Sequence, residues 1–442
     1  MTVTGPDAQG AVAGAIAAAA ERKEASSLDL LCELIAAGPN SAALNAIIER
    51  RLRASGCDTN VVAYEPRDVP MVDEFATDAI GSAAEERYIV GRLKGGSGRR
   101  LLLFAHPDVE DFRPLPAWTS DPHVPTERDG RLVGWGVADD LAGIAMMLQS
   151  LDVLDEAGVR PSGDVLLVSA PSKKHRRGIS AALHDGCQSD AAVYLHPAES
   201  GRGLDEIKAF APGQLEAVIT VDGMAPETSE PAHTAFAHRG VNPFEKARIV
   251  IDALRDLDAA RGRRIRHARL EKAIGRSSNV MVSYCKAGNE GSLSRMPRMC
   301  QIGCAMTLVP GEKLEAVMGE AESAIADACA RDEWLRDHPP SFDWRSGVSG
   351  AETEDDSDLY QTVSGILTGV GAAPVVNPLH TSSDIRNPIV QKGIPTVGFG
   401  PLCGGLTMSG QCDEWVDIAD FHRAVRATAT IIAAWCGVTP TG

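Results

Sequence analysis

The sequence predicts an α/β protein, with a mostly parallel sheet covered by helices on both faces and a smaller α+β domain inserted into it. Short apolar segments alternate with amphipathic helical segments, which is typical of parallel strands buried on both sides. Polar residues follow these apolar segments directly, where the carboxyl ends of strands in α/β proteins carry the chemistry. Near Gly213 the pattern changes to alternating strands and longer helices, which indicates the second domain.

The first domain is expected to come from two separate parts of the chain. Apolar residues at helical or strand spacing, with Gly56 in a helix C-cap position, define its elements. In order, they are helices at 28–37 and 42–54, a strand at 101–105, a helix at 139–153, strands at 164–169 and 191–195, a helix at 358–367, a strand at 394–399 and a helix at 418–436.

The inserted domain has its own order of elements, strand, helix, two strands and helix. They are expected at 214–221, 242–257, 280–285, 301–308 and 312–331. The sequence thus predicts a discontinuous domain of residues 1–212 and 331–442, interrupted by an insertion of residues 213–330.

Length and charge restrict the class of protein. A chain of 442 residues can form two or three domains. Its formal net charge of −17 argues against a nucleic-acid binder, which needs a basic surface. The ten cysteines include no C-x-x-C pair, no signal peptide is recognisable, and the alanine-rich stretch at 11–20 is too short to span a bilayer. We therefore expect a cytoplasmic protein that binds neither nucleic acid nor membrane.

Three candidate metal ligands stand at strand ends or at a helix start. His106 follows the strand at 101–105, with Asp108 two residues on, where its carboxylate can accept the second ring N–H of the histidine. His196 follows the strand at 191–195, and a glycine-rich turn delivers Asp139. Each residue alone also fits a structural role, and Asp139 in particular fits a helix N-cap. Their shared position at the predicted sheet edge favours a metal site.

These segments resemble the motifs of the dimerising zinc peptidases and amidohydrolases, a family that includes acetylornithine deacetylase, succinyl-diaminopimelate desuccinylase, aminoacylase and the glutamate carboxypeptidases. The resemblance covers residues 28–435. It rests on the strand with His106-Pro107-Asp108, on residues 129–140, on Thr381-Ser382-Ser383-Asp384-Ile385-Arg386, and on the segments 393–396 and 400–401. It implies that His106 and His196 bind a metal, that Asp139 occupies the place of a carboxylate bridging two metals, and that Asp108 orients His106.

The chain departs from this family where the second metal and the general base are expected. Lys173 and Lys174 replace a pair of glutamates, and Gly410 replaces a histidine near Asp413-Glu414. His175 is one position late for the missing ligand. We therefore expect one divalent transition metal per subunit, Zn, Mn, Co or Fe, held by His106, Asp139 and His196. Lys173 or His175 are the candidates for the missing catalytic group.

The inserted domain also resembles the family's lid domain. His233 stands nine residues before Asn242, with Ala237 in place of the family's proline. In the family this histidine acts across a dimer interface on the developing oxyanion, a role that requires a preset donor. The resemblance therefore implies a homo-oligomer through the lid domain. Candidate substrate-binding residues are Lys174, Asn242, Arg295, Arg298, His380, Ser383 and Arg386.

The predicted activity is hydrolysis of a C–N bond in a small anionic, carboxylate-bearing substrate. Because the glutamate base is missing, a substrate that is activated in another way is favoured. The favoured reaction is hydrolytic deamination of an activated amino-aromatic acid, as carried out by 5-nitroanthranilic acid aminohydrolase, a relative in the same family. The alternatives are an N-acyl-amino-acid amidohydrolase or deacylase, and a catalytically degenerate member that only binds a ligand.

Overall fold

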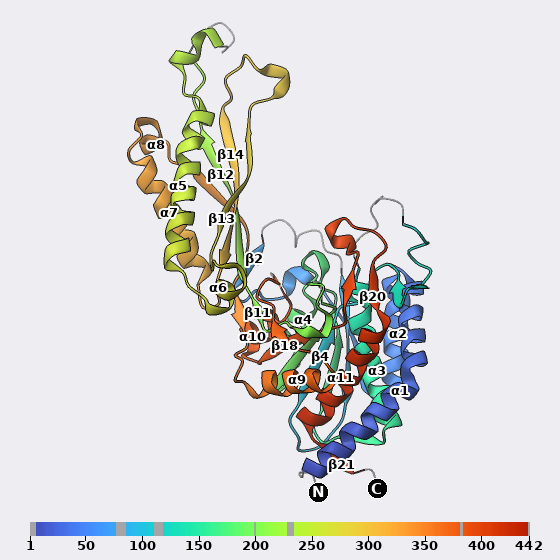
Figure 1. The fold of residues 1–442 in the computed structure, drawn as a ribbon. Coiled ribbons are helices and arrows are strands. Elements are labelled where there is room, and N and C mark those ends of the chain that lie inside the picture. Colours follow the sequence, from blue (N-terminus) through green and yellow to red (C-terminus); the bar gives the residue numbers. More distant parts are fainter. Residues whose placement is uncertain are drawn as a thin grey trace.

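The computed structural model describes residues 6–76, 85–109, 118–198, 200–227, 234–380 and 383–440. The chain forms two lobes, a broad catalytic domain and an elongated lid that projects from it (Figure 1). The N- and C-terminal ends lie together at the side of the catalytic domain opposite the lid.

The catalytic domain contains a six-stranded sheet in the order β1-β3-β8-β4-β9-β18. Strands β8, β4, β9 and β18 are parallel, whereas β3 is antiparallel to β8 and β1 to β3. The strands are β1 Asp58–Tyr64, β3 Glu86–Leu93, β4 Leu101–Ala105, β8 Val165–Ser169, β9 Ala191–Leu195 and β18 Thr396–Phe399. This confirms the predicted mostly parallel sheet and adds an antiparallel edge.

Helices cover both faces of this sheet, as predicted. Alternate residues of β4 explain why, because Leu101 and Leu103 pack into one apolar core and Leu102 and Phe104 into the other. The first face carries α1 Pro6–Ala37, α2 Ser41–Ala54, α3 Ala142–Glu156, α9 Asp358–Gly369 and α11 Ile418–Cys436, and the second carries α4 Gly178–His184 and α10 Arg386–Lys392. Helix α1 begins well before the predicted residue 28.

The lid is a five-stranded antiparallel sheet in the order β13-β14-β12-β15-β2, with α5 and α7 packed against it (Figure 1). Its elements are β2 Glu74–Ala76, β12 Gly213–Asp222, α5 Pro243–Arg264, α6 Ala268–Ile274, β13 Val280–Ala287, β14 Met299–Leu308, α7 Leu314–Cys329, α8 Glu333–Asp337 and β15 Ser341–Val348. The predicted boundary at residue 330 therefore moves to Val348, because β15 pairs with β12 inside the lid sheet.

Smaller pairings complete the fold. They are the sheet of β5 Thr126–Arg128, β6 Arg131–Val133, β20 Trp415–Asp417 and β19 Cys403–Gly404, and the pairs of β10 Glu206–Ile207 with β17 Val375–Val376, β11 Phe210–Ala211 with β16 Ala351–Glu352, and β7 Val159–Pro161 with β21 Val438–Pro440. Among the described helices, none is both long and apolar enough to cross a membrane.

Candidate metal centre

Three predicted ligands meet at the carboxyl edge of the main sheet. His106 follows β4 and His196 follows the neighbouring parallel strand β9, so the two imidazoles leave the sheet side by side. Asp139 reaches them from the turn between β6 and α3. All three side chains are buried. The structure thus brings these three side chains together at one edge of the sheet.

Both imidazoles point their Nε2 atoms at one carboxylate oxygen. Asp139 Oδ1 lies 3.1 Å from His106 Nε2 and 3.3 Å from His196 Nε2. The Nδ1 atoms lie 3.0 Å from the Asp108 carbonyl oxygen and 2.9 Å from the Pro197 carbonyl oxygen. Since a carbonyl only accepts, each Nδ1 carries a hydrogen, which leaves Nε2 as the ring nitrogen that can bind a cation beside Asp139.

This donor set fits a metal cation. Two nitrogen lone pairs and a carboxylate oxygen that converge without an intervening cation or protons repel one another, and two imidazoles with one carboxylate are ligands for Zn, Mn, Co or Fe. The neighbouring Asp140 also has an oxygen within 4.8 Å of the two imidazole atoms. However, its oxygens accept backbone N–H groups of His106 and Gly143, each at 3.2 Å, so Asp139 remains the candidate ligand.

Asp139 is not a helix N-cap. Helix α3 begins at Ala142, and Asp139 itself is extended, with φ −149° and ψ 77°. The turn is instead braced from the C-terminal part of the chain, because the Ala138 amide donates to Glu414 Oε1 at 2.8 Å. Asp139 therefore lies too far before α3 to be its N-cap, a position that Leu141 occupies.

Asp108 connects His106 to the loop that follows β8. Its Oδ1 lies 3.3 Å from His106 Nδ1 and accepts the Ser172 amide at 2.9 Å. Its Oδ2 accepts the Lys173 amide at 2.7 Å. Burial raises the pKa of Asp108, but hydrogen bonds from His106 and Ser172 outweigh it and hold the pKa below its ordinary value. The carboxylate thus orients the imidazole and places Lys173.

Lys173 occupies the far side of the Asp139 carboxylate. Its ammonium group hydrogen bonds to Oδ2, while Oδ1 faces the two imidazoles. Burial raises the pKa of Asp139, but His106, His196 and Lys173 together lower it well below its ordinary value. Burial lowers the pKa of His106, yet hydrogen bonds to Asp108 and Asp139 raise it well above the ordinary value. Without a metal, the Nε2 atom of this ring therefore also carries a proton.

Glu414, which was not among the predicted site residues, supports the turn that carries Asp139. It is fully buried, accepts Ala138 N–H and, at 2.8 Å, the Thr407 hydroxyl. Burial and the charge of Asp139 raise the pKa of Glu414 to about 7. The signal that could have identified it is its place beside Asp413, in the family's C-terminal acidic pair.

A cavity of about 1250 Å³ opens over the metal ligands. It contains the predicted residues His380 and Ser383, and the His380 ring lies edge-on to the His196 ring at 5.9 Å. The buried Ser383 hydroxyl has no hydrogen-bond partner among the described residues, so it is available to a ligand. None of the described residues lining this cavity is a glutamate.

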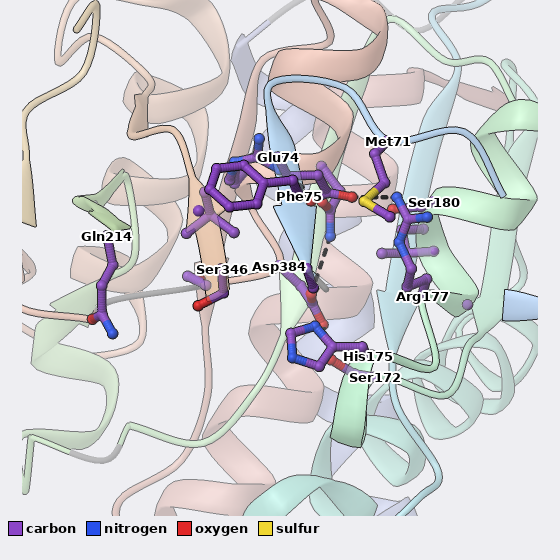
Figure 2. A pocket seen from close by; sticks show the side chains of 18 of the residues that line it. Met71, Glu74, Phe75, Ser172, His175, Arg177, Ser180, Gln214, Ser346 and Asp384 are labelled. Atoms are coloured by element: carbon purple, nitrogen blue, oxygen red, sulfur yellow. Dashed lines mark hydrogen bonds and ion pairs between the residues drawn. The ribbon is translucent and has the colours of Figure 1, made fainter. Parts of the chain in front are cut away.

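A second cavity, of about 440 Å³, lies beside Lys173 at the hinge with the lid. Figure 2 shows His175 on its wall, and this exposed residue does not line the larger cavity over His106, Asp139 and His196. Arg386 also lines it, but its guanidinium group is taken by Glu74, Ser349 and the backbone carbonyls of Val72 and Asp73. Arg386 thus connects the start of α10 to the segments 72–74 and 349, and it does not line the larger cavity.

The predicted lid residues that the structure describes lie in segments away from the metal centre of their own chain. Asn242 caps α5 by accepting the Phe244 amide at 3.1 Å, and Arg295 and Arg298 are exposed in the segment between β13 and β14. In Figure 1 this end of the lid lies away from the catalytic sheet. His233, Thr381 and Ser382 lie outside the described residues, as does the side chain of Lys174.

A two-domain α/β fold with a buried two-histidine, one-carboxylate cluster defines the class of metal-dependent hydrolases with an inserted lid. The chain belongs to the peptidase family M20/M25/M40, whose profile it matches over residues 102–434. The prediction of the family and of a metal-dependent hydrolase is thereby confirmed.

Individual relatives show how broad this family is. The chain is 25% identical to an N-formyl-4-amino-5-aminomethyl-2-methylpyrimidine deformylase of Halalkalibacterium halodurans, over 79% of this chain and 82% of the relative. It is 28% identical to a succinyl-diaminopimelate desuccinylase of Xanthomonas oryzae, over 92% and 97%. The fold matches aminopeptidase PepT of Bacillus cereus with a TM-score of 0.68 and 16% identity, over 92% of this chain and 98% of that one. A dinuclear metal-binding peptidase of Bacillus subtilis matches with a TM-score of 0.58 and 12% identity, over 94% and 98%.

Proposed function

We propose that this chain hydrolyses the amide C–N bond of a small N-acylated amine or amino acid, using one firmly bound divalent metal. One observation carries the proposal, namely the way the Asp139 carboxylate is shared. One oxygen faces the Nε2 atoms of His106 and His196, and the other accepts the ammonium group of Lys173.

The position of Lys173 supports one metal instead of two. In a dinuclear site each oxygen of the bridging carboxylate faces a metal. Here the ammonium group of Lys173 already lies against the second oxygen. Its positive charge repels a second divalent ion, and a protonated amine has no lone pair with which to bind one. Lys173 thus supplies a fixed positive charge at the second oxygen of Asp139.

A divalent metal at this place supplies a Lewis acid and a means of activating water. The chain supplies the geometry. Asp108 holds His106 and the Lys173 backbone, Glu414 holds the turn that carries Asp139, and the buried Ser383 hydroxyl faces the cavity. Arg202 and Lys272 on the cavity wall provide the positive charge expected for an anionic substrate.

Amide hydrolysis comes first because the relatives named above remove formyl and succinyl groups from nitrogen. Deamination of an activated amino-aromatic acid, as by a 5-nitroanthranilate aminohydrolase, is the second candidate. It is favoured by a cavity without a described glutamate base and with the Tyr194 and His380 rings on its wall. If the protein catalyses neither reaction, it is a family member that binds a ligand without turnover.

We further propose that the chain works as a homo-oligomer through the lid, with His233 acting on the partner's site. The support is the resemblance of the lid motif, together with the position of the start of α5 and of the segment between β13 and β14 at the end of the lid away from the catalytic sheet (Figure 1).

Metal analysis of the purified protein tests the proposal. About one Zn, Mn, Co or Fe per chain is expected, with none retained in His106→Ala and full content in Lys246→Met, which removes a lysine ion pair to Asp332 in the lid. Assays with N-formyl, N-succinyl and N-acetyl compounds and with 5-nitroanthranilate then separate the two activities. Two tightly held metals per chain would contradict the single-metal site.

A further inference from the structure

A fully buried ion pair lies directly behind the metal centre, outside the set of ligands. Lys208 and Glu206 are 0% and 1% exposed, and Lys208 Nζ lies 3.2 Å from Glu206 Oε1. Burying two charges is costly and often contributes little net stability, so such a pair calls for a role beyond stability. The contacts on its two sides indicate that role.

The ammonium side holds the metal ligand His196. Lys208 Nζ donates to the His196 carbonyl at 3.1 Å and to the Pro197 carbonyl at 2.9 Å. The Pro197 carbonyl is the same oxygen that accepts His196 Nδ1–H. Lys208 is itself fixed to the sheet, since its backbone exchanges two hydrogen bonds of 2.7 Å with Gly398 of β18.

The carboxylate side holds the loop that forms one wall of the larger cavity. Glu206 Oε2 accepts the Asn377 side-chain amide at 3.0 Å, and Asn377 Oδ1 accepts the backbone amide of Leu379 at 3.0 Å. Asn377, Leu379 and His380 all line the cavity. The pair therefore joins the backbone of a metal ligand to the wall where the substrate is proposed to bind.

We infer that Lys208 and Glu206 form a positioning unit, in which Lys208 fixes the Pro197 carbonyl so that His196 presents its Nε2 lone pair to the metal, and Glu206 holds the loop 374–380 in register with it. The inference rests on the proposed function, because it requires His196 to be a metal ligand. Partners behind a metal-bound histidine commonly change metal affinity by about 10- to 100-fold when they are removed.

The test uses the full chain with Co²⁺ as the probe. In Lys208→Met the Co²⁺ affinity is expected to fall at least about tenfold. Because this variant leaves Glu206 buried without its partner, Lys208→Met/Glu206→Gln is measured beside it, and the loss of affinity should persist there. Lys246→Met, a lysine ion-pair variant in the lid, should bind Co²⁺ as the wild type does.

Two readouts separate positioning from general damage to the fold. Nitrogen-15 NMR of the metal-free protein should show His196 with its proton on Nδ1 in the wild type and a mixture of tautomers in the double variant. Hydrogen exchange at 374–380 should accelerate in Asn377→Ala while Co²⁺ affinity stays unchanged. Wild-type Co²⁺ affinity and an unchanged His196 tautomer in the double variant would overturn the inference. Since the tautomer is read without metal, failure of the proposed metal site is distinguishable from failure of this inference.

Discussion

At the scale of single residues, Asp139 determines how the site responds to pH. His106 lies 3.1 Å from its Oδ1, and in the absence of metal the pKa of His106 is well above the ordinary value, chiefly because hydrogen bonds to Asp108 and Asp139 overcome the effect of burial. A metal can bind Nε2 only after that proton has left. Metal binding near pH 7 should therefore release about one proton per chain, and affinity should weaken as the pH falls. Calorimetry in buffers of different ionisation enthalpy measures this number, and binding without proton release would contradict the assignment.

The ammonium group of Lys173 is expected to matter more for catalysis than for holding the first metal. In Lys173→Met, Asp139 loses a positive neighbour, so affinity for a divalent cation should stay equal or rise by Coulomb attraction. Turnover should fall by about 100-fold or more, as when a preset charge-stabilising group is removed from an active site. Metal titration and steady-state kinetics on the same preparation check both statements. A variant that loses its metal would show that Lys173 is structural instead.

The sequence allowed His106, Asp108, Asp139 and His196 to be predicted because strand ends in α/β sheets place side chains at a common edge. Lys208 could not be found in this way. A lysine between apolar residues is usually exposed on a surface, and only the three-dimensional packing shows that its side chain is 0% exposed.

At the scale of elements, two buried arginines clamp strand β2. Glu74 accepts hydrogen bonds from Arg177, in the loop after β8, and from Arg386, at the start of α10. Their side chains are 6% and 4% exposed. This clamp ties strand β2 of the lid sheet to the loop that carries Lys173.

Glu74→Ala should therefore destabilise the protein by about 3–5 kcal/mol, because it leaves both guanidinium groups buried without a carboxylate. The comparison is Lys313→Ala, which breaks the ion pair of Lys313 with Asp73, the residue before Glu74. The side chains of Lys313 and Asp73 are 68% and 44% exposed, so this variant should lose less than about 1 kcal/mol of unfolding free energy. Denaturant unfolding of both variants gives the comparison. Equal effects would mean that the arginines find other partners.

Helix α11 should make stability pH-dependent through His422. Burial lowers the pKa of His422, and the partial opposition of Glu24 does not restore it. Below about pH 6.5 the unfolded chain takes up a proton that the native histidine does not. The free energy of unfolding should thus fall as the pH drops through this range, and His422→Gln should lose that part of the fall. Urea unfolding at pH 7.5 and 5.5 tests it, and identical losses in both proteins would refute it.

The elements themselves were largely predictable, since the strands and helices with clear periodicity all occur. The exceptions are contacts between distant segments. Strand β15 and strand β2 complete the lid sheet from outside the predicted insertion, because strand pairing depends on partners that no local pattern identifies. The turn at Asp139 is likewise set by Glu414, which is far away in sequence.

At the scale of the whole molecule, the lid separates two sets of predicted functional residues. The metal ligands lie in the catalytic domain. The projecting end of the lid contains the start of α5, which Asn242 caps, and the segment between β13 and β14, which contains Arg295 and Arg298 (Figure 1). Exposed apolar side chains, including Met281 and Tyr284 on the edge strand β13 and Met299 on β14, occur on the same domain. Both features favour a second copy of the chain against the lid, which would bring these residues toward the other copy's metal centre.

Mixing two inactive variants tests this arrangement. His106→Ala removes a metal ligand but keeps the lid histidine, and His233→Ala does the reverse. In a mixed dimer, the site on the His233→Ala chain receives an intact His233 from the other chain. One of the two sites of the dimer is therefore complete. Random exchange of subunits should restore about a quarter of the wild-type activity per chain, because half the dimers are mixed and each has one complete site. The matched control mixes His106→Ala with His196→Ala, which damages the metal site in both chains and should restore nothing. If His233→Ala alone keeps wild-type activity, or if the mixture stays inactive although subunits exchange, the histidine does not act across the interface.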